Sequence, residues 1–65
     1  DALVADIASY LRQEAPEATE SASHEELHDF VTVWIDKALS FGITDSYLIQ
    51  QLCLFAIWLG PDFEN

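Results

Sequence analysis

Apolar side chains recur every three or four residues along most of this chain, and that spacing constrains its fold more than any other feature. Such a repeat is typical of an amphipathic α-helix. It is clearest after residue 26, where one helical stripe consists of Leu27, Phe30, Val31, Trp34, Ala38 and Phe41, with Ile35 at its edge. Ser23 and Glu26 form a capping-box pattern before the stripe, and Gly42 suits the left-handed position after it.

The preceding stretch, residues 1–14, shows the same spacing. Its apolar face consists of Leu3, Ile7, Tyr10 and Leu11. Pro16 follows, and a proline ring removes the backbone hydrogen bond that a continuing helix needs. Residues 15–22 are small, polar and acidic, so we predict a loop there.

A third helix is predicted to begin after Thr44, which can cap it, and to end at Gly60. This helix is apolar on both sides. We expect its core face to consist of Leu48, Leu52, Phe55, Ala56 and Leu59. Leu54, Ile57 and Trp58 then point away from that face, where two other short helices have little surface to cover them.

These stretches predict an all-α fold, a compact three-helix domain with helices at about residues 1–14, 24–41 and 45–59, and a single acidic domain over residues 1–65. Twelve Asp and Glu residues against two basic residues give a net charge of −10, and 51% hydrophobic residues exclude a disordered acidic tail. A chain of this size supports one small core, so we do not expect a deep catalytic pocket.

The acidic composition also bears on partners and compartment. Nucleic acids and anionic membranes attract Lys and Arg, so we expect neither as a partner. Cys53 is the only cysteine, which excludes an intramolecular disulfide and favours a reducing, cytoplasmic location. No signal peptide or membrane-spanning stretch is visible. The start at Asp1, without an initiator Met, is compatible with a fragment of a longer protein.

The segment from His24 to His28 reads His-Glu-Glu-Leu-His and matches the H-E-x-x-H pattern of zinc metalloproteases. In that pattern two imidazoles one helical turn apart bind zinc, and the first Glu, here Glu25, is the general base. The segment lies in a first helical turn, and no third ligand is clearly positioned downstream. We therefore predict no catalytic residue, no metal and no cofactor, and keep a zinc hydrolase as a remote alternative.

Two surface features point to protein binding. Large apolar side chains on the uncovered side of the third helix are typical of an interface, and we predict contacts through Leu54, Ile57, Trp58 and Tyr47. Acidic side chains on the solvent side of the second helix can orient a basic partner, and the candidates are Glu25, Asp29 and Asp36.

The junction of the second and third helices carries a resemblance. Residues 30–37, the turn Phe41–Thr44 and the ending Gly60-Pro61-Asp62-Phe63 resemble small uncharacterised helical proteins encoded beside type VI secretion effectors in proteobacteria. The stretch from Tyr10 to Glu17 resembles the helix-then-proline segment of the same proteins. The resemblance implies a bacterial protein that acts beside a secreted toxin, and it implies no catalytic residues. Those relatives continue past the Gly-x-Asp-Phe turn.

We therefore expect a non-catalytic protein-binding module, an adaptor or chaperone-like partner of a secreted effector. Two alternatives stay open. One is an acidic inhibitor or immunity-like protein that blocks a toxin's basic active site. The other is self-association through the third helix, since an exposed apolar face can pair with its own copy.

Overall fold

The computed structural model describes residues 2–60 and contains α-helices only within that range: α1 (Ala2–Glu14), α2 (Pro16–Thr19), α3 (His24–Ser40) and α4 (Ser46–Trp58). The predicted all-α class is confirmed. Helices α1, α3 and α4 are the three predicted helices, with ends that differ by about one residue, as helix ends commonly do. Asp1 and the Pro61, Asp62 and Phe63 of the Gly-x-Asp-Phe ending lie outside the described residues.

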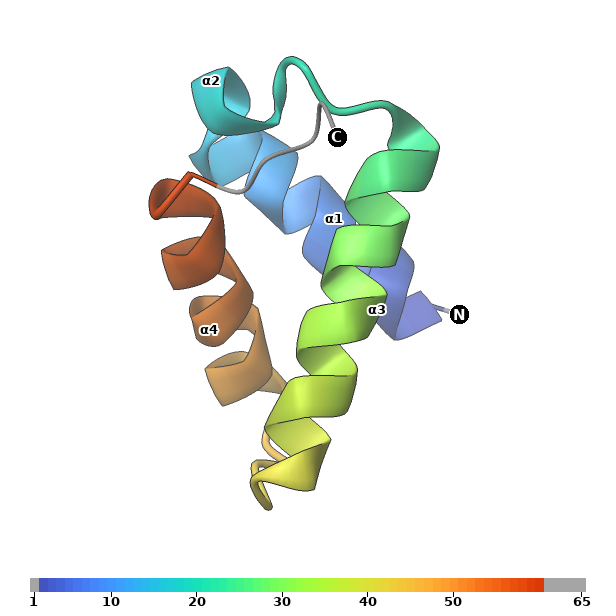
Figure 1. Cartoon of the computed structure of the whole chain (residues 1–65), viewed down its shortest axis with the longest axis vertical. Helices are drawn as coiled ribbons and strands as arrows, with labels where there is room; N and C mark the ends of the chain where they lie inside the picture. Colours follow the sequence, from blue (N-terminus) through green and yellow to red (C-terminus); the bar gives the residue numbers. More distant parts are fainter. Residues whose placement is uncertain (1, 61–65) are drawn as a thin grey trace.

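The three long helices all contact one another and enclose one core (Figure 1). In Figure 1, α3 and α4 lie side by side at the front, and α1 lies behind them. Helix α2 sits at the end of the molecule where α4 finishes. The largest fully buried side chains come from all four helices and include Ile7, Leu11, Thr19, Leu27, Val31, Cys53 and Ile57.

The segment predicted as a loop contains a helix, so that prediction is wrong for residues 16–19. Pro16 occupies the first helical turn, where a missing N–H costs nothing. The Thr19 hydroxyl donates to the Ala15 carbonyl at 2.9 Å, and both residues are buried. The small side chains of this segment let it pack closely against the core. Because it contains no periodic stripe of large apolar residues, its sequence does not indicate a helix.

Capping explains where α3 and α4 begin. The predicted capping box is present: the Ser23 hydroxyl accepts from the Glu26 N–H at 3.1 Å, and the Glu26 carboxylate accepts from the Ser23 N–H at 2.8 Å. Asp45, and not the predicted Thr44, caps α4, with one carboxylate oxygen accepting from the Tyr47 N–H at 2.8 Å. A carboxylate also complements the positive end of the helix dipole, which a hydroxyl does not.

The end of α3 corrects the predicted stripe at Phe41. Gly42 has φ of +81°, as predicted, and the N–H of Ile43 reaches back to the Ala38 carbonyl at 2.9 Å. These bonds form a Schellman motif, in which the chain leaves the helical path. Phe41 therefore no longer follows the helical repeat and is 76% exposed, while Ile43 packs against the core.

Candidate protein-binding surface

Helix α4 buries a side that only partly overlaps the predicted core face. The side chains that enter the core are Ile49, Cys53, Ala56 and Ile57, which are one or two helical turns apart. Of the predicted core face, only Ala56 is buried, and Leu52 is partly buried against the core. Leu48, Phe55 and Leu59 are exposed, so the predicted face is wrong at these three positions.

The opposite side of α4, which we call the outer face, consists of large exposed hydrophobic residues: Tyr47 (64%), Leu48 (54%), Phe55 (63%), Trp58 (61%) and Leu59 (71%). Their spacing places them along one side of the helix. Helix α4 contains no charged residue at all. A helix that is apolar all round is typically buried all round, and here only one side is covered.

The predicted contact residues divide between the two sides. Ile57 is 1% exposed and belongs to the core, so its prediction as an uncovered side chain is wrong. Leu54 is partly buried and packs against the core. Trp58 and Tyr47 are exposed, as expected, but they share the outer face with Leu48, Phe55 and Leu59, which were predicted to be buried. Their role in binding stays a prediction.

Leu48, Phe55 and Leu59 were not predicted as surface residues, because α4 carries apolar side chains on both sides. Periodicity then does not select a face. A different signal is present in the side-chain sizes. Cys53 and Ala56 are small and lie with two Ile residues on one side, and small residues allow helix backbones to approach closely.

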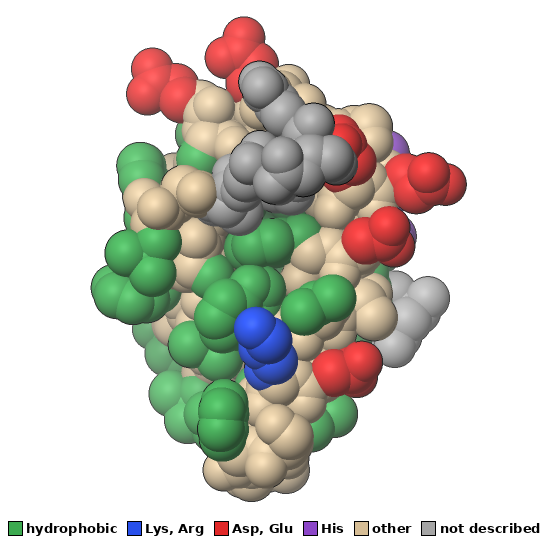
Figure 2. Space-filling model, viewed as in Figure 1, with side chains coloured by type: hydrophobic (Ala, Val, Ile, Leu, Met, Phe, Trp, Pro, Cys, Tyr) green, Lys and Arg blue, Asp and Glu red, His purple; other side chains and the backbone are tan. Residues whose placement is uncertain are grey.

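Acidic side chains lie beside the apolar surface. The predicted stripe of Glu25, Asp29 and Asp36 is exposed along one side of α3. In Figure 2, hydrophobic side chains gather over α4 and the strip between α4 and α3, whereas acidic side chains lie along the α3 side and the upper end. A partner that covers this side of the molecule would therefore contact an apolar centre that borders one basic side chain, with carboxylates farther out at the margin.

Both basic side chains are engaged within the fold. The Arg12 guanidinium donates to the Thr19 carbonyl at 3.1 Å and to the Ala22 carbonyl at 3.0 Å. The Lys37 ammonium lies 4.7 Å from the centre of the Trp34 ring, a cation–π distance. Within residues 2–60, neither forms a salt bridge with a carboxylate. The negative charge of the surface is therefore not neutralised by ion pairs in the described part of the chain.

The two histidines of the H-E-x-x-H segment lie together in the first turns of α3. Their ring centroids are 4.2 Å apart. The Nε2 of His28 is shielded from solvent and has no hydrogen-bond partner in the structure, so a metal ion would reach this nitrogen only after the ring turned. Among residues 2–60, no group of three or more His, Cys, Asp or Glu side chains is arranged to hold a metal ion.

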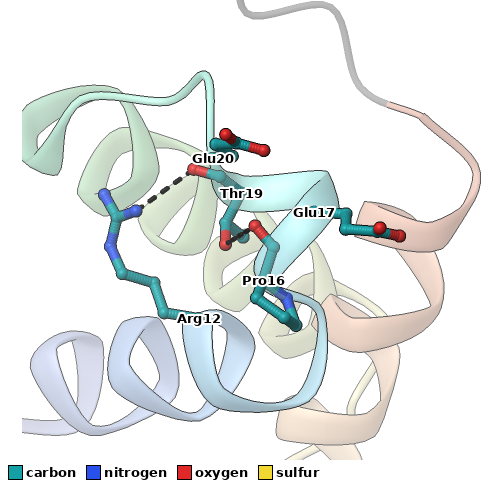
Figure 3. A pocket seen from close by; sticks show the side chains of 5 residues that line it. All are labelled: Arg12, Pro16, Glu17, Thr19 and Glu20. Atoms are coloured by element: carbon teal, nitrogen blue, oxygen red, sulfur yellow. Dashed lines mark hydrogen bonds between the residues drawn. The ribbon is translucent and has the colours of Figure 1, made fainter.

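A shallow hollow of about 470 Å³ lies between α1 and α2, lined by Arg12, Pro16, Glu17, Thr19 and Glu20 (Figure 3). The Arg12 side chain crosses it to reach the Thr19 carbonyl, while Glu17 and Glu20 point away from Arg12. The polar groups of this hollow therefore do not converge on one point. The guanidinium joins the end of α2 and the segment after it to α1, which is a structural role.

Cys53 is buried in the core as a free thiol. Burial raises its pKa to about 11, because the thiolate would lose its hydration. The thiol therefore stays protonated at neutral pH, and a protonated thiol is a poor nucleophile and metal ligand.

Comparisons with protein-family models, with curated proteins and with solved structures gave no match. Over the described residues, every helix is too short or too polar to cross a lipid bilayer.

Proposed function

We propose that this chain is a non-catalytic protein-binding module that docks its partner on the outer face of α4. One observation carries the proposal: five large hydrophobic side chains lie exposed on one side of a helix without charges. Exposing such a patch is unfavourable in water, and contiguous exposed apolar patches commonly mark interaction sites. Aromatic anchors such as Trp58 and Tyr47 are the residue types that dominate interface energetics.

The resemblance of residues 41–44 and 60–63 to proteins encoded beside type VI secretion effectors makes a secreted effector the first partner to test. In that setting the module is an adaptor or chaperone-like protein of the bacterial cytoplasm. A buried free thiol in Cys53 agrees with a reducing compartment.

A second candidate is an acidic inhibitor that occupies a toxin's basic active site. The exposed stripe of Glu25, Asp29 and Asp36 favours it, together with the lack of salt bridges to Arg12 and Lys37 in the described residues. The two candidates differ in which surface holds the partner. For the adaptor it is the outer face of α4, and for the inhibitor it is the acidic side of α3.

The test is affinity purification of the tagged protein from the cells that make it, followed by titration of the co-purified partner with matched variants. Phe55→Ser removes an apolar side chain from the outer face of α4, and Val33→Ser removes one from α3, where Val33 is also half exposed. We expect Phe55→Ser to weaken binding by at least about tenfold, the effect of losing a typical hot-spot residue, and Val33→Ser to leave it unchanged.

A third variant, in which Glu25→Gln, Asp29→Asn and Asp36→Asn are combined, separates the candidates. Binding that is lost in this variant and retained in Phe55→Ser would assign the function to the acidic stripe. Binding that is equally strong in all variants would place the partner elsewhere on the chain and would refute both candidates.

A further inference from the structure

We infer that the partner of the outer face of α4 is a protein segment whose apolar side chains are flanked by Lys and Arg. The inference rests on the proposed function, because it names the chemistry of the partner at the same surface. It follows from the net charge of −10, from the carboxylates near both ends of the outer face, and from the absence of charge on the face itself.

Acidic groups lie near both ends of the outer face, and others lie farther away on α3. Asp45 caps α4 at its N-terminal end and is exposed. Glu17 extends from α2 on the side of α4, and α2 lies next to the C-terminal end of α4 (Figures 1 and 3). The stripe of Glu25, Asp29 and Asp36 lies on the side of α3 that faces away from the core, farther from the outer face than Asp45 or Glu17. A segment docked on α4 therefore meets carboxylates near both of its ends.

The field of the carboxylates is only partly offset by the two cations. Arg12, bonded to two backbone carbonyls, and Lys37, over Trp34, both keep their positive charges, but twelve Asp and Glu residues outnumber them. A net charge of −10 on a domain with a radius of gyration of 10.8 Å gives a field that reaches beyond the surface at physiological salt, where the screening length is about 8 Å. A basic partner would be attracted by this field, and an acidic or neutral one would not.

The same charges argue against a second copy of this chain as the occupant. Pairing two outer faces would cover ten hydrophobic side chains, which is favourable. It would also bring together two domains that each carry a net charge of −10, with few cations to offset the repulsion. Opposite charges at the rim of an interface select partners, and like charges exclude them.

The test uses two synthetic amphipathic helical peptides of about five turns with the same Leu face. One peptide carries Lys on its polar face and the other carries Glu. Binding to the whole chain is measured by isothermal titration calorimetry at about 50 mM and about 500 mM NaCl. We expect the Lys peptide to bind and to weaken by at least about tenfold at the higher salt, and the Glu peptide to bind at least about a hundredfold more weakly.

Matched variants show whether the peptide uses the proposed surface. Phe55→Ser should weaken the Lys peptide by at least about tenfold, Val33→Ser should not, and the triple change at Glu25, Asp29 and Asp36 should reduce the salt dependence. Circular dichroism of each variant checks that the helices are retained.

The possible results separate the inference from the proposed function. Equal binding of both peptides, lost in Phe55→Ser, would overturn the basic partner and keep apolar docking. Binding of the Lys peptide that ignores Phe55→Ser would mean charge attraction alone and would overturn both. No binding of either peptide overturns the inference and leaves the co-purified partner to test the function. A dimer of the chain alone at high salt, detected by analytical ultracentrifugation, would assign the outer face to a second copy and overturn the inference of a basic partner.

Discussion

The face that α4 turns inward can be tested by two substitutions in the same helix. Ile57 is 1% exposed, and Ile57→Val removes one buried methylene group, which typically costs about 0.5–1.5 kcal/mol. Phe55 is 63% exposed, and Phe55→Ala removes a much larger side chain from the surface, which typically costs less than about 0.5 kcal/mol. The smaller change is therefore expected to destabilise the domain more than the larger one.

The conservative substitution at Ile57 keeps the comparison measurable. At roughly 0.05–0.15 kcal/mol per residue, a chain of 65 residues has a total stability of about 3–10 kcal/mol. Ile57→Ala typically costs about 2–5 kcal/mol and would unfold the domain if its stability lies in the lower half of that range. Ile57→Val leaves the domain folded.

The assay is urea unfolding followed by far-UV circular dichroism, with thermal unfolding as a second measure. We expect Ile57→Val to lower the melting temperature by roughly 4–8 °C per kcal/mol lost, and Phe55→Ala to leave it nearly unchanged. If Phe55→Ala lowers stability by more than Ile57→Val, then α4 packs with its other face inward and the outer face defined above does not exist.

Three further predictions concern the fold around the binding surface. Arg12→Lys should lower the free energy of unfolding in urea by about 1–2 kcal/mol, because one ammonium does not replace two guanidinium hydrogen bonds to the Thr19 and Ala22 carbonyls. An effect no larger than that of Gln13→Ala would contradict a structural role for Arg12. Ser23→Ala should cost about 1 kcal/mol through loss of the capping box, while Ser21→Ala, two residues earlier in the connection between α2 and α3, should cost almost nothing in the same assay. Burial raises the pKa of Cys53 from 9.0 to about 11, so the unfolded chain loses this proton first and stability should fall between pH 9 and 11, by about 1 kcal/mol at pH 10. The same pH series with Cys53→Ala should lack this fall, and parallel curves would show that the thiol is not buried.

Much of the fold could be predicted from local chemistry. The capping box at Ser23 and Glu26 and the positive φ of Gly42 mark the ends of α3, and each acts within a few residues of the chain. The apolar residues of α1 and α3 recur every three or four positions, and this spacing defines one inward face on each helix. Leu11, Leu27 and Val31 are buried as that pattern predicts.

The candidate site was less accessible to the same reasoning, and α4 shows why. This helix carries apolar residues on more than one side, so its own pattern does not select an inward face. That face is determined by how closely the helix packs against α1 and α3, which is a tertiary property. Ile57 and Phe55 are both good core residues by type, and only the packing of three helices decides between them. Helix α2 was missed for a related reason, because small side chains such as Ala15 and Thr19 are buried by tight packing and not by a large apolar area.

The most direct test of the outer face as a docking surface is site-specific photocrosslinking in the cells that make the protein. Benzoylphenylalanine is placed at Phe55 on the outer face or at Val33 on α3, both of which are at least half exposed. We expect one discrete adduct with a basic protein from position 55, lost when the chain without the crosslinker is overproduced in the same cells, and no such adduct from position 33. The same adduct from both positions, or an adduct from position 33 alone, would contradict that expectation.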